Sequence, residues 1–109
     1  DNLLARVNDT LWQSGSFKLQ SDIKSRIYYP NHVLVGLSDS GDEAFVMAHF
    51  YLMPGRDDAT IQSLAQRIAD AIKAHLQEFK SEVPAGNLQI CVNSTTLSAN
   101  YVKQYVEFK

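Results

Sequence analysis

The fold is decided by the stretch DEAFVMAHFYLMPGRDDATIQSLAQRIADAIKAHLQEF, which runs from Asp42 to Phe79. Residues 44–53 are apolar apart from His49, and the turn formers Pro54 and Gly55 follow them. Beyond the turn, apolar residues recur at the three- and four-residue steps of one helix face: Ile61, Leu64, Ala65, Ile68, Ile72, Leu76 and Phe79. The stretch therefore predicts a strand, a turn and an amphipathic helix, which together form half of a βαβ unit.

The residues after this stretch supply the strand that completes the unit. Residues 84–86 (Pro-Ala-Gly) end the helical segment. Residues 88–93 then place Leu88, Ile90 and Val92 on one face of a predicted strand. The second half of the chain is therefore a full βαβ unit.

The first half has the pattern of the same unit without its opening strand. Apolar residues at helical spacing predict a helix over roughly residues 2–13, which Ser14-Gly15-Ser16 ends. Residues 22–29 alternate with period two, and this pattern predicts a strand. Because a crossover helix joins two parallel strands, we expect a further strand ahead of residue 1. The expected fold class is α/β (α+β): a two-layer fold with duplicated βαβ units, a mixed sheet and two helices, forming a single domain over residues 1–109.

Two further segments are less specific. Residues 33–37 are apolar and lead into the turn-rich residues 38–42, so either a short strand or a helical turn is compatible with them. The tail, residues 101–109, alternates in the manner of a strand, and it is expected to pair at a sheet edge, with a neighbouring copy as one option.

The central strand, about Glu43–Met53, is apolar on both faces, so both faces require a cover. Two helices cover only one side of a small sheet, and another subunit is the natural cover for the second side. His49 is interpreted as an interface or core histidine, because no second His, Cys or carboxylate stands near it at metal-ligand spacing.

Composition narrows the class of protein. The chain has 109 residues, 45% hydrophobic and 20% charged, which suits one globular domain. Its formal net charge of -2 argues against nucleic acid as the main partner. No apolar run approaches the roughly 20 residues of a membrane span, so we expect no membrane partner. The single cysteine, Cys91, fits a reducing compartment and predicts a cytoplasmic location.

An ordered set of short patterns resembles 5-carboxymethyl-2-hydroxymuconate isomerase, a family of the tautomerase superfamily. The resemblance runs from about Leu3 to Val92 and continues more loosely through Thr96-Leu97 and Tyr101. Its pieces are Gly15-x-Phe17-x-Leu19, Ile23-Lys24-Ser25-Arg26, Asp42-x-Ala44-Phe45-Val46, Gly55-Arg56 and Ile72-Lys73-x-His75. The resemblance implies a homotrimer and a cofactor-free 1,3- or 1,5-proton shift in an unsaturated 2-hydroxy diacid, as in aromatic catabolism.

The resemblance also implies the site. An N-terminal proline would be the base, since a secondary amine of lowered pKa is neutral where a lysine is protonated. Arg56 matches the arginine of the Gly-Arg turn, Lys24 stands where the family has its other functional arginine, and Arg26 matches a second basic position. Arg56 and Lys24 are thus the candidate catalytic residues, and together with Arg26 they would bind a small anionic substrate through its carboxylates.

Two departures keep an alternative open. Position 1 is Asp1, so the proline base is expected in a segment ahead of it, and Lys24 keeps the charge but not the fork of an arginine. A non-catalytic trimeric binding or structural protein of the same fold is the second hypothesis. An unrelated small α/β interaction domain is the third. From the residues alone, Arg56 also suits a surface position after a turn, and Arg26 suits an ion pair.

Overall fold

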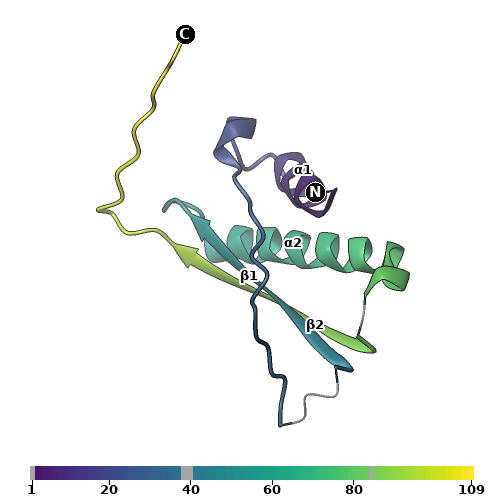
Figure 1. The fold of residues 1–109 in the computed structure, drawn as a ribbon. Helices are drawn as coiled ribbons and strands as arrows, with labels where there is room; N and C mark the ends of the chain where they lie inside the picture. Colours follow the sequence, from purple (N-terminus) through teal and green to yellow (C-terminus); the bar gives the residue numbers. More distant parts are fainter. Residues whose placement is uncertain (1, 38–40, 84) are drawn as a thin grey trace.

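The computed structural model describes residues 2–37, 41–83 and 85–109 (Figure 1). Its elements follow in the order α1 (Asn2–Gln13), the 3-10 helix η1 (Gln20–Asp22), β1 (Glu43–Leu52), α2 (Asp58–Glu78), the 3-10 helix η2 (Lys80–Glu82) and β2 (Asn87–Thr96). Asp1 and the turn residues predicted at 38–40 and at Pro84 lie outside the described residues.

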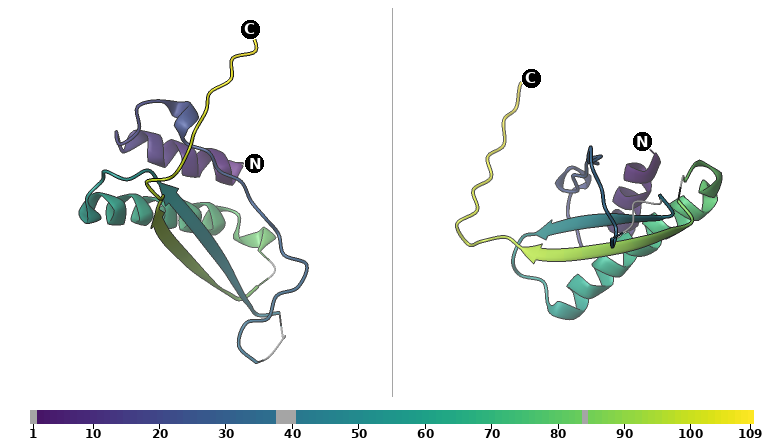
Figure 2. Two further views of the ribbon diagram at one scale, coloured as in Figure 1. Left: turned by 90° about the vertical axis from the view of Figure 1, so that its left-hand side faces the viewer. Right: turned by 60° about the horizontal axis from the view of Figure 1, so that its bottom comes forward.

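The β1–α2–β2 unit confirms the predicted βαβ arrangement. β1 and β2 are parallel and pair over their whole length, from Glu43 opposite Asn87 to Leu52 opposite Thr96. α2 connects them and lies along one face of the pair (Figure 2). The helix begins where Asp57 caps it, since an Asp57 carboxylate oxygen accepts the backbone N–H of Thr60 at 2.8 Å.

The cap makes the stability of α2 depend on pH. Hydrogen bonding by Thr60, through its side chain and then its backbone N–H, lowers the pKa of Asp57 below its usual 3.8. A carboxylate whose folded-state pKa is depressed stabilises the fold above its unfolded-state pKa, and this contribution is lost as the pH falls through the folded-state value.

We therefore expect wild type to melt at a higher temperature than Asp57→Asn at pH 7, because asparagine keeps an acceptor but carries no charge at the positive helix end. The gap should shrink as the pH falls below the usual carboxyl pKa of about 4 and should be lost once the pH passes the lowered pKa of folded Asp57. Melting curves of both proteins at neutral and acidic pH measure it. A gap that stays constant over this range would contradict the assigned cap.

The core lies between the two helices and the inner face of the sheet. Its buried members are Val7 and Leu11 of α1 with Leu64, Ile68 and Ile72 of α2. Alternate residues of the strands pack against this cluster: Val46, Ala48, Phe50, Ile90 and Val92. α1 lies beside α2 (Figure 2), and polar contacts join the two helices as well. Arg67 donates to the Thr10 carbonyl at 3.2 Å, and Arg6 forms an ion pair with Glu78.

The other face of β1 has no cover among the described residues. Phe45 and Met47 are each 47% exposed, and Tyr51 is 60% exposed. The strand alternates strictly between covered and exposed side chains up to its last residue. The prediction of two apolar faces is therefore confirmed, with one of them open to solvent in the single chain.

The predicted strand at residues 22–29 is wrong. Asp22 closes η1, and residues 23–35 are extended without belonging to a sheet (Figure 1). A strand forms only where a neighbouring backbone completes its hydrogen-bond ladder. No backbone hydrogen bond connects residues 24–37 to another described residue. Side chains hold the start of the segment instead, since Asn8 donates to the Ile23 carbonyl at 3.5 Å and accepts from Ser25 at 2.7 Å.

The remaining segments are irregular. Residues 33–35 form neither strand nor helix, and Gly36 and Leu37 lie in a turn. The tail, residues 101–109, forms no strand with the described part of the chain and runs extended and exposed away from the sheet (Figure 1), so pairing with a neighbouring copy stays a prediction. Its Lys103 ammonium forms an ion pair with the Asp22 carboxylate at 2.9 Å. The sheet of the described residues thus contains two parallel strands, and the antiparallel strand of a mixed sheet stays a prediction.

Candidate functional site

The candidate site lies at the carboxyl ends of the two parallel strands. Both strands end at this edge, and the turn that follows β1 carries Gly55 and Arg56 immediately before the cap of α2. Gly55 has a φ of 119°, a backbone conformation that favours glycine and allows the chain to reverse here. The turn therefore places Arg56 at the carboxyl edge of the described sheet.

Arg56 is half-buried and held by two consecutive residues that follow α1. Its Nη2 donates to the Ser16 carbonyl at 2.8 Å, and its Cζ lies 4.8 Å from the centroid of the Phe17 ring. Neither contact was predicted, although Phe17 belongs to the resembling pattern. The sequence carries only a weak signal for these contacts, because no residue near Arg56 indicates that its side chain meets Ser16, which lies 40 residues earlier in the chain.

The Arg56 charge has no carboxylate partner in the described part of the chain. The ion pairs there are Arg6 with Glu78 and Lys103 with Asp22. A guanidinium group carries five N–H donors, and the Ser16 carbonyl takes one of them. The remaining donors are chemically suited to a carboxylate, which accepts two parallel N–H bonds from an arginine.

Lys24 and Arg26 lie on the extended segment that follows η1, and both are exposed. The Cζ of Arg26 stands 6.0 Å from the ring centroid of Tyr28. Lys24 lies near Asp22, whose pKa is lowered mainly by the hydrogen bond from Lys103, with a smaller contribution from the charge of Lys24. No hydrogen bond or ring contact of the described residues joins Lys24 or Arg26 to Arg56. That the three predicted cations share one site stays a prediction.

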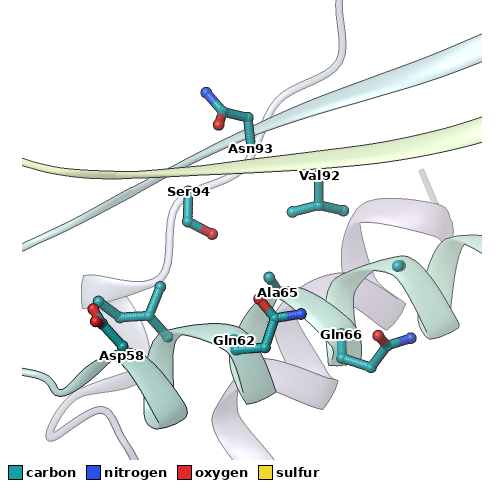
Figure 3. Close-up of a pocket in the computed structure, with 9 residues that line it drawn as sticks. Asp58, Gln62, Ala65, Gln66, Val92, Asn93 and Ser94 are labelled. Atoms are coloured by element: carbon teal, nitrogen blue, oxygen red, sulfur yellow. The ribbon is translucent and has the colours of Figure 1, made fainter.

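An open groove of about 510 Å³ lies between α2 and β2 (Figure 3). Val92 and Ser94 point from β2 toward α2, and Gln62 and Gln66 lie opposite them on the helix. The ionisable group in its lining is the carboxyl group of Asp58, which repels anions. A smaller cavity of about 250 Å³ lies between α1 and η1, lined by Asn8, Asp9, Trp12, Gln20 and Ile23. Neither contains a predicted site residue, and neither suits a dianionic substrate.

Across residues 2–37, 41–83 and 85–109, no three His, Cys, Asp or Glu side chains come together as a metal site would require. None of the helices in the described part of the chain is long and apolar enough to cross a membrane.

Comparison with known proteins identifies the family. The family model described as 5-carboxymethyl-2-hydroxymuconate isomerase matches residues 1–104. No curated protein matches the chain. The matched range covers α1, the extended segment with Lys24 and Arg26, the whole β1–α2–β2 unit and the turn that carries Arg56. The chain therefore belongs to the 5-carboxymethyl-2-hydroxymuconate isomerase family.

Proposed function

We propose that the protein is a cofactor-free tautomerase that ketonises an unsaturated 2-hydroxy diacid. The family match over residues 1–104 carries this proposal. The geometry supports it, because Arg56 presents N–H donors without a carboxylate partner at the carboxyl edge of the described sheet. A substrate carboxylate would supply the missing negative charge.

The proposed reaction moves one proton from the 2-hydroxyl oxygen to a carbon of the conjugated chain. The oxygen–hydrogen bond breaks, a carbon–hydrogen bond forms, and the 2-hydroxyl carbon becomes a carbonyl, so no cofactor is consumed. Arg56 would bind a substrate carboxylate through its parallel N–H donors. The proposed base is an N-terminal proline in a segment ahead of Asp1, since a neutral secondary amine accepts a proton at neutral pH.

Lys24 and Arg26 are proposed to bind the second carboxylate. A lysine ammonium supplies a point charge in place of the planar fork of the family arginine, so we expect binding to persist with less directional preference. Because one apolar face of β1 is uncovered in the single chain, we propose that the site is completed between neighbouring subunits of a homotrimer.

The uncovered face of β1 supports this assembly. The radius of gyration is 16.2 Å, whereas a compact chain of about 100 residues has one near 13 Å. The extended residues 23–35 and 101–109 account for this expanded shape, and a partner copy would cover the open sheet face. A small anionic substrate and two further copies of the chain are thus the proposed partners. The predicted cytoplasmic location stays a prediction.

We expect Met47→Glu to convert the native assembly into monomers, because it places a charge in the middle of the open apolar face. Light scattering with size-exclusion chromatography measures the mass. Gln77→Glu introduces the same side chain on the exposed surface of α2 and serves as the control. A wild type that is already monomeric would contradict the homotrimer, as would a Met47→Glu protein that keeps the wild-type mass.

The activity is tested on the native protein with a 2-hydroxymuconate-type dienol, whose ultraviolet absorbance changes as the conjugated enol becomes a ketone. Intact mass and N-terminal sequencing of the same sample establish whether a proline is the first residue. Turnover by a protein with this proline supports the proposal. If a protein that carries the proline does not accelerate ketonisation of the dienol above the uncatalysed rate, the proposed activity is refuted. A trimer without turnover would favour the binding or structural alternative.

A further inference from the structure

We propose that Phe17 is a positioning residue, which holds the Arg56 guanidinium in the orientation that receives a substrate carboxylate. This role rests on the proposed function, because the orientation of Arg56 matters to activity only where Arg56 binds an anion. Phe17 would touch neither the substrate nor the reacting atoms, and it would act through Arg56 alone.

Two contacts restrict the guanidinium at different points. The Ser16 carbonyl accepts a hydrogen bond from Arg56 Nη2 at 2.8 Å, and this bond fixes one edge of the guanidinium group. The Phe17 ring centroid lies 4.8 Å from Cζ, within the range of a cation–π contact. A hydrogen bond by itself leaves the guanidinium free to rotate about that bond. The ring removes this freedom, because the cation gains energy only where it lies near the ring.

The Phe17 ring is itself held in place. Phe17 is half-buried and packs against the core cluster that contains Val7, Leu11 and Leu64. The turn before it is closed by Ser14, whose hydroxyl donates to the Leu11 carbonyl and accepts the backbone N–H of Ser16 at 3.2 Å. The position of the ring is therefore set by the end of α1 and by the core, and it does not depend on a ligand.

A fixed arginine binds a carboxylate with a smaller entropic penalty than a mobile one. An exposed arginine samples many rotamers, and binding has to select one of them. Here the ring and the carbonyl have selected the rotamer beforehand, and the donors that Ser16 does not use remain available. The carboxylate contact exists in both the bound substrate and the transition state, so losing its preorganisation raises KM more than it lowers kcat.

The test compares Phe17→Leu with Phe17→Tyr in the native protein. Leucine keeps an apolar side chain against the core but has no aromatic face, whereas tyrosine keeps the ring. We expect Phe17→Leu to raise KM about three- to tenfold, the range of a partly buried cation–π contact, with kcat within about twofold of wild type. Phe17→Tyr should stay within about twofold of wild type in both constants.

A second readout does not require activity. The Arg56 Nε–H resonance in a ¹⁵N–¹H NMR spectrum, assigned by its loss in Arg56→Ala, senses the ring current of Phe17. We expect it to move toward the position of a free arginine in Phe17→Leu and to stay near its wild-type position in Phe17→Tyr. Melting curves establish that the variants are folded, and Phe17→Met, which keeps a larger apolar volume, replaces Phe17→Leu where that protein fails to fold.

The two readouts separate the failure of this role from the failure of the proposed function. A folded Phe17→Leu protein with wild-type KM and an unmoved Arg56 resonance would overturn the positioning role. If wild type shows no turnover, the proposed function fails, and the resonance alone decides whether Phe17 holds Arg56. If the Arg56 resonance moves in Phe17→Leu while KM stays constant, Phe17 contacts Arg56 but does not affect substrate binding. This outcome would also overturn the proposal.

Discussion

Arg56→Ala is expected to lower kcat/KM for a 2-hydroxymuconate-type dienol by roughly 100- to 1,000-fold. The change removes a charge-assisted bidentate contact to a carboxylate, and each hydrogen bond to a charged group contributes about 1.5–3 kcal/mol. Their sum corresponds to at least two factors of ten in rate. Arg56→Lys should recover part of the loss, because it restores the charge but not the fork.

Arg67→Ala is the matched control. Arg67 also donates to a backbone carbonyl, that of Thr10 at 3.2 Å, and it lies on α2 between the two helices instead of at the carboxyl edge of the sheet. Both alanine variants therefore lose one arginine and one hydrogen bond to a backbone carbonyl. We expect Arg67→Ala to keep kcat/KM within about threefold of wild type, once melting curves show that both proteins are folded. Equal kinetic constants for Arg56→Ala and wild type would refute the carboxylate role.

Leu64→Ala is expected to cause the largest loss of stability. Leu64 is 1% exposed and lies in the middle of the cluster between α1, α2 and the sheet. Removing a buried leucine side chain costs about 2–5 kcal/mol, because apolar contacts are lost and a cavity remains. Since 1 kcal/mol shifts Tm by about 4–8 °C in a domain of this size, Tm should fall by roughly 10 °C or more.

Leu37→Ala makes the same chemical change at a fully exposed position, since Leu37 has a relative exposure of 102% in the single chain. We expect its free energy of unfolding to stay within about 0.5 kcal/mol of wild type. Thermal and urea unfolding of the two variants measure the difference. A Leu64→Ala protein as stable as wild type would contradict the position of the core, and a marked loss in Leu37→Ala would show that Leu37 becomes covered in the native assembly.

The β1–α2–β2 unit could be predicted because its signals are local. The Pro54-Gly55 turn, the Asp57 cap and the apolar stripe of α2 all act within a few residues of the structure that they specify. Residues 22–29 show the opposite case. Their period-two pattern indicates that they suit a strand, but a strand also needs a neighbouring backbone, and the sequence of one segment does not reveal whether that neighbour is present.

The candidate site likewise has a part that local sequence signals predict and a part that depends on long-range contacts. The place of Arg56 in a turn between strand and helix could be predicted because it is a local property, whereas its role in a site rests on the family resemblance and stays a prediction. The contacts of its guanidinium with Ser16 and Phe17 could not be predicted, because they depend on how the end of α1 docks beside the turn after β1. The place of Lys24 and Arg26 relative to Arg56 could not be predicted either, since their strand pattern does not specify what the segment pairs with.

The docking of α1 on α2 also sets how often the candidate site is intact. α1 has 12 residues, and its fully buried contribution to the core is Val7 and Leu11. Short elements with few buried contacts open locally at a lower free energy than the global unfolding of the protein. Because Ser16 and Phe17 stand three and four residues after the last residue of α1, each such opening would release Arg56 from both contacts. The local opening equilibrium of α1 then limits the fraction of molecules that can bind substrate. Amide hydrogen exchange in α1 would measure this equilibrium.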